Sequence, residues 1–175
     1  MDGNGTGTDK KGAAAGRTVE LLIPVYKPGV ELAALIERMR RQTAPPQSIH
    51  LLVTASEREF EELRERYERF WKDMETRPGR VGIPALRFTR IAPEEFDHGG
   101  TRHLGASQSH ADVLLFMTQD AAPDDEYLVE RLLEALESPD GGPETAAAHA
   151  RQLPAADCNA IERFTRAFNY PDESR

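Results

Sequence analysis

Short apolar runs alternate along this sequence with segments whose apolar residues recur at helical spacing. The apolar runs, each a predicted strand, are residues 19–26, 49–54, 86–91 and 113–118. The intervening predicted helices are residues 30–42 and 56–75, whose apolar residues have this spacing, and a short stretch after His98 that a glycine-containing turn opens. Regular alternation of strand and helix is typical of a mostly parallel sheet that is covered on both faces. We therefore predict an α/β fold with a doubly wound, mostly parallel, Rossmann-like sheet.

Local signals at the ends of these segments refine the prediction. Pro24 lacks the N–H group that a ladder needs, so the first strand is expected to stop pairing there. Ser56 and Glu59 match a capping box at the start of the second predicted helix. That helix is strongly amphipathic, and its apolar face carries Phe60, Leu63, Tyr67, Phe70, Trp71 and Met74.

The C-terminal part of the chain gives fewer signals. Asp124 or Asp125 is expected to cap a helix in which Leu128, Leu132 and Leu136 share a face. Three further segments are predicted to be a turn, a loop and a strand, namely residues 77–80, 139–143 and 145–150.

Length and charge limit the classes of protein to consider. A chain of 175 residues fits one domain, and a domain of this size buries about 70% of its unfolded surface. Residues 1–17 contain no apolar core, so we expect a disordered tail rather than a secretory signal, followed by a domain over residues 18–175. The net charge of −8 argues against a general binder of nucleic acid. The negative net charge is compatible with a nucleotide site, because a metal ion and a helix N-terminus supply local positive potential.

The cysteine content and the hydropathy of the sequence indicate the cellular compartment in which the protein is expected. Cys158 is the only cysteine of the sequence, so no internal disulfide forms and we expect a reducing compartment. No apolar run approaches the ~20 residues that cross a bilayer. We therefore expect a cytoplasmic protein, and association with the cytoplasmic face of the inner membrane stays open.

The segment 95–123 is the most informative part of the chain. Gly99 and Gly100 are expected to open a helix whose backbone N–H groups approach an anionic group. An apolar run follows and leads to Asp120. Ligands of open parallel sheets bind at the carboxyl ends of the strands, where a lone carboxylate suits Mg²⁺ or Mn²⁺ that substrate phosphates already hold. Zinc is disfavoured, since no cysteine accompanies the histidines of this segment.

These residues also carry a resemblance to a known family. The run His98-Gly-Gly-Thr-Arg-His-Leu-Gly, followed by Leu115-Phe-Met-Thr-Gln-Asp-Ala, resembles the nucleotide-sugar glycosyltransferases of family two, especially the rhamnosyltransferase-like branch. The resemblance runs from about Val19 to the C-terminus. It implies the nucleotide-diphospho-sugar transferase-like fold, without the C-terminal acceptor half. It also implies inverting transfer of a sugar such as rhamnose to a glycan or lipid-linked acceptor in polysaccharide biosynthesis.

The resemblance implies roles for individual residues. Thr118-Gln119-Asp120 stands where the family has Asp-x-Asp, so Asp120 is the remaining ligand for Mg²⁺ or Mn²⁺. The residues implied to bind the nucleotide or the donor sugar are Pro24, Val25, Tyr26, Thr54, Ser56, Gly100, Arg102, Thr118, Gln119 and Arg151.

Several of these residues have a simpler alternative role. Tyr26 either contacts the planar base or covers the sheet edge. Arg102 either bonds the diphosphate, braces the Asp120 loop, or forms a surface ion pair. The hydroxyl of Ser56 is more readily explained as a helix cap, and Arg151 as part of a solvated loop.

Two departures from the family's pattern affect recognition. Val53 and Thr54 stand where many relatives carry an acidic pair that reads the base, so base recognition depends on backbone groups or on the hydroxyls of Thr54 and Ser56. His103 stands where relatives usually carry Asn.

Catalytic competence is a separate question. Inverting transfer needs a general base for the acceptor hydroxyl, and in the family this carboxylate lies well downstream of the Asp-x-Asp strand. The chain ends at Arg175, before such a region. We expect either a fragment of a longer enzyme or a non-catalytic nucleotide-binding or interaction module. A fragment would expose apolar residues where its missing part docks, such as Phe164 and Phe168, and this exposure would favour self-association.

Overall fold

The computed structural model describes residues 16–76, 83–137, 145–154 and 158–170. It divides into two compact units, Met1–Arg131 and Leu132–Arg175. The turn predicted at 77–80, the loop predicted at 139–143 and most of the predicted tail lie outside the described residues. The domain boundary expected after residue 17 stays a prediction.

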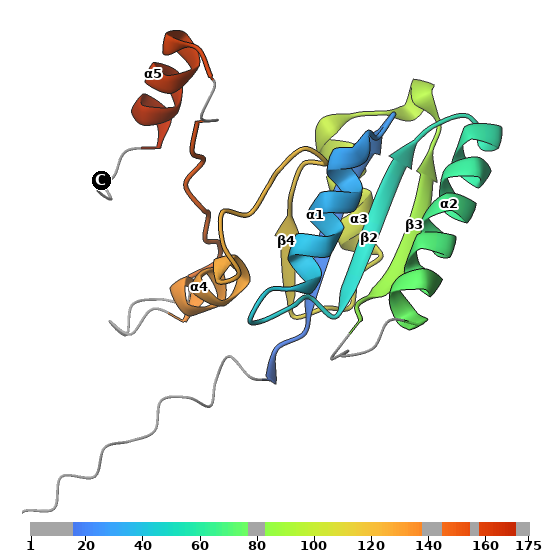
Figure 1. The fold of residues 1–175 in the computed structure, drawn as a ribbon, viewed down its shortest axis with the longest axis horizontal. Helices are drawn as coiled ribbons and strands as arrows, with labels where there is room; N and C mark the ends of the chain where they lie inside the picture. Colours follow the sequence, from blue (N-terminus) through green and yellow to red (C-terminus); the bar gives the residue numbers. More distant parts are fainter. Residues whose placement is uncertain (1–15, 77–82, 138–144, 155–157, 171–175) are drawn as a thin grey trace, which may run out of the picture. The chain divides into compact units, whose positions relative to one another are not determined.

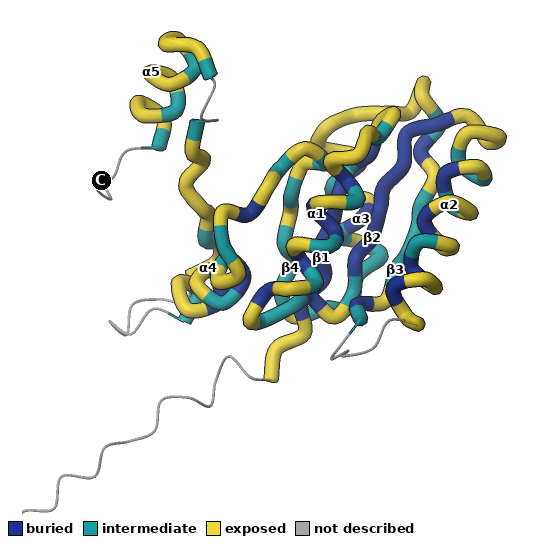
Figure 2. Tube along the Cα trace, viewed as in Figure 1, coloured by how far each residue is buried: buried dark blue, intermediate teal, exposed yellow. Residues whose placement is uncertain are grey.

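The first unit contains a four-stranded parallel sheet, which confirms the predicted fold class. Its strands are β1 (Val19–Tyr26), β2 (Ser48–Thr54), β3 (Ala85–Ile91) and β4 (Val113–Phe116), in the spatial order β3-β2-β1-β4 (Figure 1). β1 and β2 are the two inner strands, and β1 pairs with β2 on one side and with β4 on the other. The most deeply buried segments of the sheet are β1 and β2 (Figure 2).

Helices cover both faces of this sheet, as the alternating pattern predicts. Figure 1 shows α1 (Val30–Arg40) on one face and α3 (His98–Ser107) on the other. A short 3-10 helix, η2 (Pro93–Glu95), precedes α3. The amphipathic helix α2 (Glu57–Thr76) lies beside β3 and buries four of the six apolar residues that the sequence placed on one face: Leu63, Tyr67, Trp71 and Met74.

Pro24 does not end β1, contrary to our prediction. It stays in register with Leu52, and pairing with β2 continues to Tyr26. The N–H and C=O groups of successive residues in a strand point alternately to the two neighbouring strands. The carbonyl of Leu22 accepts the N–H of Met117, so it points to the β4 side, and Pro24, two residues on, points the same way. The missing N–H of Pro24 therefore faces the β4 side, where the β1–β4 ladder has already ended at Leu22.

β4 is shorter and more exposed than the sequence predicted. It ends at Phe116 instead of Thr118, and it is the outermost strand on its side of the described sheet. Three of its residues are half-buried and the side chain of Phe116 is 43% exposed. The prediction of a buried strand is wrong because, among the described residues, β4 has a neighbour on one side only.

Helix α4 (Leu128–Leu136) buries a different face from the predicted one. Val129 and Leu133 are buried, whereas the three predicted leucines are only half-buried. Both stripes have i, i+4 spacing, so periodicity alone did not select between them. Of the two predicted capping residues, Asp125 holds the turn that leads into the helix, because its carboxylate accepts the N–H of Tyr127 at 2.9 Å.

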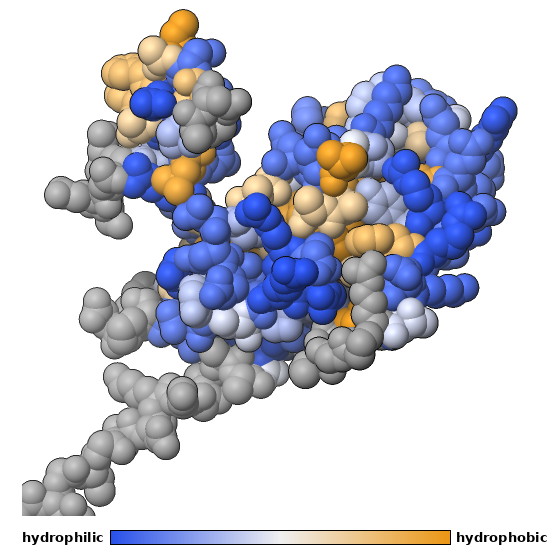
Figure 3. Space-filling model, in the orientation of Figure 1, coloured by the Kyte–Doolittle hydropathy of each residue, from blue (hydrophilic) through white to orange (hydrophobic). Residues whose placement is uncertain are grey.

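The second unit contains helix α5 (Ala160–Asn169), whose N-cap residue Asn159 accepts the N–H of Glu162 at 2.9 Å. Residues 145–150, predicted to be a strand, have no regular structure. That prediction is wrong because a run of alanines offers a sheet little side-chain surface. Apolar side chains gather on the surface of α5 (Figure 3). No helix in the described part of the chain is both long and apolar enough to span a membrane.

Candidate functional site

The chain reverses its direction across the sheet at the boundary between β1 and β4. From β1 it proceeds through α1 to β2 and then to β3, all on one side, and it returns through α3 to place β4 on the other side. Such a topological switch point leaves a crevice at the carboxyl ends of the two diverging strands, where ligands of open α/β sheets bind. The candidate site is therefore the region beyond the ends of β1 and β4.

A side-chain amide bridges the two diverging strands. The last rung between them is the N–H of Met117, which donates to the carbonyl of Leu22 at 3.2 Å. Farther along, the carboxamide of Gln119 accepts the N–H of Tyr26 at 2.8 Å and donates to the carbonyl of Tyr26 at 3.0 Å. The structure thus brings together Tyr26 and Gln119, two of the residues that the sequence assigned to donor binding.

The end of β1 presents an aromatic ring at this edge. Tyr26 is 55% exposed, and the ammonium group of Lys27 lies 5.2 Å from its ring centroid. Lys27 has a φ of 42°, the left-handed region that non-glycine residues rarely adopt. This sharp turn directs the chain into α1 and leaves the Tyr26 ring accessible. Of the other two predicted residues on this strand, Pro24 is half-buried and Val25 is buried.

Thr54 ends the neighbouring strand, in register with Tyr26. It is 6% exposed, and its buried hydroxyl has no hydrogen-bond partner among the described residues. A buried hydroxyl without a partner is uncommon because its desolvation is not compensated. Thr54 therefore offers an unused polar group beside the predicted base-contacting residue.

Ser56 has the capping role that the sequence favoured. Its hydroxyl and its backbone N–H both donate to Oε2 of Glu59, at 2.6 and 3.0 Å, and the N–H of Glu59 donates back to the hydroxyl at 3.4 Å. These hydrogen bonds hold the pKa of the Glu59 carboxyl below its ordinary value. The predicted capping box is confirmed.

The N-terminus of α3 contains its own carboxylate. Asp97 is the N-cap, and its side chain accepts the N–H of Gly100 at 2.6 Å. That hydrogen bond is the main reason why the pKa of Asp97 lies below its ordinary value. The guanidinium of Arg102 donates to the carbonyl of His98 at 2.8 Å, within the same helix. Gly100 and Arg102 thus both have partners in the first turns of α3.

Asp120 lies in a turn directly after the bridging glutamine. The N–H of Ala121 donates to the carbonyl of Thr118 at 3.1 Å, which closes the turn. Thr118 and Asp120 are exposed, and within the described residues the Asp120 carboxylate has no hydrogen bond or ion pair. No group of three or more acidic, histidine or cysteine side chains that could hold a metal ion occurs in the described ranges.

Arg151 is exposed and belongs to the second unit. Its predicted role toward the donor sugar stays a prediction.

Sequence reasoning missed a polar network on the α3 face of the sheet. The buried Glu20 pairs with Arg87 at 2.9 Å, and Arg87 also donates to the carbonyl of Gln108 at 3.2 Å. Next to them, Nε2 of His50 lies 2.8 Å from the hydroxyl of Thr89. The sequence signal that could have indicated this network is the presence of Glu20 and His50 within two otherwise apolar predicted strands.

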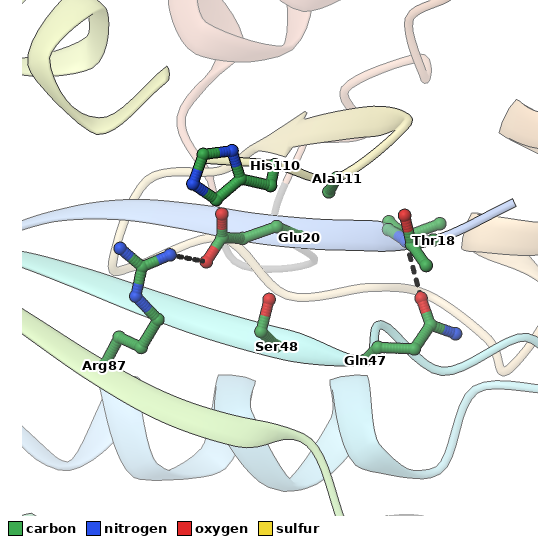
Figure 4. Close-up of a pocket in the computed structure, with 8 residues that line it drawn as sticks. Thr18, Glu20, Gln47, Ser48, Arg87, His110 and Ala111 are labelled. Carbon is green, nitrogen blue, oxygen red and sulfur yellow. Dashed lines mark hydrogen bonds and ion pairs between the residues drawn. The ribbon is translucent and has the colours of Figure 1, made fainter. Parts of the chain in front are cut away.

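Part of this network lines a hollow of about 260 Å³ at the opposite, amino-terminal edge of the sheet. Figure 4 shows Glu20, Arg87, Ser48 and His110 around it. The hollow is therefore separate from the candidate site at the carboxyl ends of the strands.

Comparison with known proteins adds evidence of a different kind. The chain is 29% identical over 157 residues to the O-antigen chain rhamnosyltransferase RfbN of Salmonella typhimurium, a match that covers 89% of this chain and 44% of the relative. It is 38% identical over 85 residues to the O-antigen chain rhamnosyltransferase WbaN of Salmonella anatum, covering 48% of this chain and 26% of the relative. No protein-family model matches the chain.

These similarities confirm the resemblance to rhamnosyltransferases. The narrower assignment to family two stays a prediction. The matched region spans less than half the length of each of these two relatives.

Proposed function

We propose that this chain contains the donor-binding site of an inverting, rhamnosyltransferase-like glycosyltransferase. The observation that carries the proposal is the switch point between β1 and β4, where Tyr26, Thr54 and Asp120 follow or end parallel strands. Similarity to two O-antigen chain rhamnosyltransferases supports the choice of reaction. The donor would be a nucleotide-diphosphate sugar, with dTDP- and UDP-linked rhamnose as the first candidates.

The proposed roles of the residues follow from their exposure and their unused polar groups. The exposed ring of Tyr26 would stack against the base. The hydroxyl of Thr54, which is buried and unpaired in the ligand-free chain, would rotate towards the site and bond a polar group of the base or ribose. An acidic pair at the end of β2 would bind an imide N–H more strongly than a hydroxyl does. We therefore expect only modest selectivity for uracil and thymine nucleotides, which both carry this imide N–H, over cytosine nucleotides, which lack it.

Asp120 would hold Mg²⁺ or Mn²⁺ together with the two phosphates of the donor. Its exposed carboxylate, free of other partners in the described residues, is a hard oxygen ligand. One such ligand is sufficient because Mg²⁺ commonly takes one or two protein carboxylates and completes its shell with phosphate and water. The bound metal would supply Lewis-acid stabilisation of the diphosphate leaving group.

The transfer itself also needs a base. The acceptor hydroxyl oxygen would bond to the anomeric carbon while the bond from that carbon to the diphosphate breaks, and a general base would take the hydroxyl proton. We assign no described residue to this step. The acceptor would be a glycan or a lipid-linked glycan.

Titration calorimetry with UDP and dTDP, with and without Mn²⁺, tests the donor site. We expect binding to depend on the metal and to weaken at least tenfold in Asp120→Asn. Asp124→Asn is the matched control, because it removes an exposed carboxylate a few residues farther along the chain. Equal affinity of wild type and Asp120→Asn would eliminate the metal role of Asp120.

A non-catalytic nucleotide-binding or interaction module is the alternative. Incubation with a dTDP- or UDP-linked sugar and a lipid-linked glycan acceptor separates the two possibilities. Transfer that is abolished by Asp120→Asn supports the enzyme. Metal-dependent nucleotide binding without any transfer supports the module.

A further inference from the structure

We propose that Gln119 is a positioning residue: its carboxamide fixes the spacing between the Tyr26 backbone and the Asp120 turn without itself contacting the donor. The inference rests on the proposed function, since it concerns the same crevice between β1 and β4. It narrows the role that the resemblance implied for Gln119, which was either binding of the nucleotide sugar or orientation of the shell around the metal ion.

The first argument concerns the backbone hydrogen bonds that β1 makes on the side that faces β4. Leu22 provides the last rung to β4, and the next residue on that side, Pro24, has no N–H to offer. β4 ends at Phe116, level with Leu22, so the strands separate there. Tyr26 is the following residue on this side, and its N–H and C=O would face the crevice unpaired.

The second argument is the geometry of the two hydrogen bonds. A carboxamide has a donor N–H and an acceptor oxygen on one planar group, the same pair of functions that a backbone peptide offers to a strand. The Gln119 amide meets both polar groups of Tyr26, at 2.8 and 3.0 Å. It therefore acts as one additional rung of the sheet beyond the point where β4 ends.

The consequence is a mechanical link across the crevice. The side chain of Gln119 is hydrogen-bonded to the backbone of Tyr26, and Gln119 directly precedes Asp120 in the chain. The distance between the residue proposed to contact the base and the residue proposed to hold the metal is then fixed before the donor binds. Both polar backbone groups of Tyr26 are occupied, which leaves its ring as the part available to the donor.

Two substitutions test this inference. Gln119→Met keeps the length of the side chain and removes both hydrogen bonds, whereas Gln119→Asn keeps the amide but shortens its reach. The matched control is Gln152→Met, which alters a glutamine of the second unit whose amide oxygen bonds Arg166. All variants are made in the full chain.

The first measurement is residue-resolved amide exchange without ligand. In both Gln119 variants the Tyr26 amide is expected to exchange at least tenfold faster. The β1 amides that pair with β2 should keep their wild-type rates, which separates loss of the bridge from general destabilisation. Unchanged exchange of Tyr26 would overturn the inference, whether or not any nucleotide binds.

The second measurement is the affinity for UDP or dTDP with Mn²⁺. Removal of a residue that orients a metal ligand typically weakens binding by ten- to a hundredfold, and we expect about tenfold in both Gln119 variants. Wild-type affinity in these variants would overturn the positioning role and leave the proposed function intact. If the wild-type chain binds no nucleotide under any condition, the proposed function fails and the positioning role fails with it.

Discussion

His50 lies buried at the middle of β2, with only one of its ring nitrogens hydrogen-bonded. The single hydroxyl proton of Thr89 goes to the amide oxygen of Gln108 at 3.0 Å. Nε2 of His50 must therefore donate to the Thr89 oxygen, which leaves Nδ1 as an unprotonated atom without a partner in the described residues. A second ring proton would enter a buried position with no acceptor.

Burial, and next the positive charge of Arg87, lower the pKa of His50, while the opposing charge of Glu20 raises it less. The folded pKa thus lies below the unfolded value of about 6.5. The unfolded chain binds a proton that the folded chain rejects, so stability is full above pH 6.5 and falls as the pH drops below it. We predict that urea midpoints decline between pH 7.5 and pH 5.5, and decline less in His50→Phe. An equal decline in the two proteins would contradict this assignment.

Thr54 allows a prediction in which stability and binding change in opposite directions. Thr54→Val removes a buried hydroxyl that has no partner, and it should stabilise the free chain by about 1 kcal/mol. If the hydroxyl bonds the nucleotide, the same change should weaken nucleotide affinity by about tenfold. Urea denaturation and calorimetry on one pair of proteins measure both effects. Unchanged affinity would show that Thr54 does not contact the base or ribose.

At the scale of secondary-structure elements, α3 approaches the sheet closely at one glycine. Gly105 is buried, and a Cβ atom there would lie 2.7 Å from Cδ1 of Leu52, which is itself fully buried. Because Leu52 has no room to withdraw, Gly105→Ala should cost about 1–3 kcal/mol in urea denaturation. Gly99→Ala is the control in the same helix, since the nearest atom to its added Cβ is 3.4 Å away. A Gly105→Ala chain as stable as Gly99→Ala would contradict close packing of α3 on β2.

Most elements of the first unit follow from the sequence alone, because each has a local signal. Periodicity predicts the two longest helices, α1 and α2, and the four strands. The Ser56–Glu59 capping box gives the start of α2 within one residue. The end of β4 and the buried face of α4 were not predictable in this way. The end of β4 and the buried face of α4 depend on which other elements pack against them, and the spacing of apolar residues does not contain this information.

The candidate site was only partly predictable for a similar reason. Parallel strand ends meet at one edge, so Tyr26, Thr54 and Asp120 could be assigned to that edge from the order of elements. The bridge from Gln119 to Tyr26 joins residues 93 positions apart in the chain, and nothing in either local pattern indicates it. The ion pair between the buried Glu20 and the partly exposed Arg87 depends likewise on the register of β1 and β3 across β2.

At the scale of the whole molecule, the second unit presents an apolar surface on α5. Ile161, Phe164 and Phe168 are 79%, 71% and 64% exposed, and the rings of the two phenylalanines stack with centroids 6.2 Å apart. Their i, i+3, i+7 spacing makes a continuous apolar stripe on one side of the helix. Exposed stripes of this kind promote association, which the net charge of −8 opposes.

We predict that hydrophobic association prevails at micromolar concentration, so that the 175-residue chain sediments as a concentration-dependent mixture of monomer and larger species. Phe164→Glu places a charge within the apolar stripe and should shift the distribution towards monomer. Asn169→Glu adds the same charge at an exposed position about 100° around the helix from Phe168, outside the stripe, and should leave the distribution close to that of wild type. Sedimentation velocity over a tenfold range of concentration measures all three proteins. A wild-type chain that stays monomeric across that range, and binds no hydrophobic dye, would contradict self-association through α5.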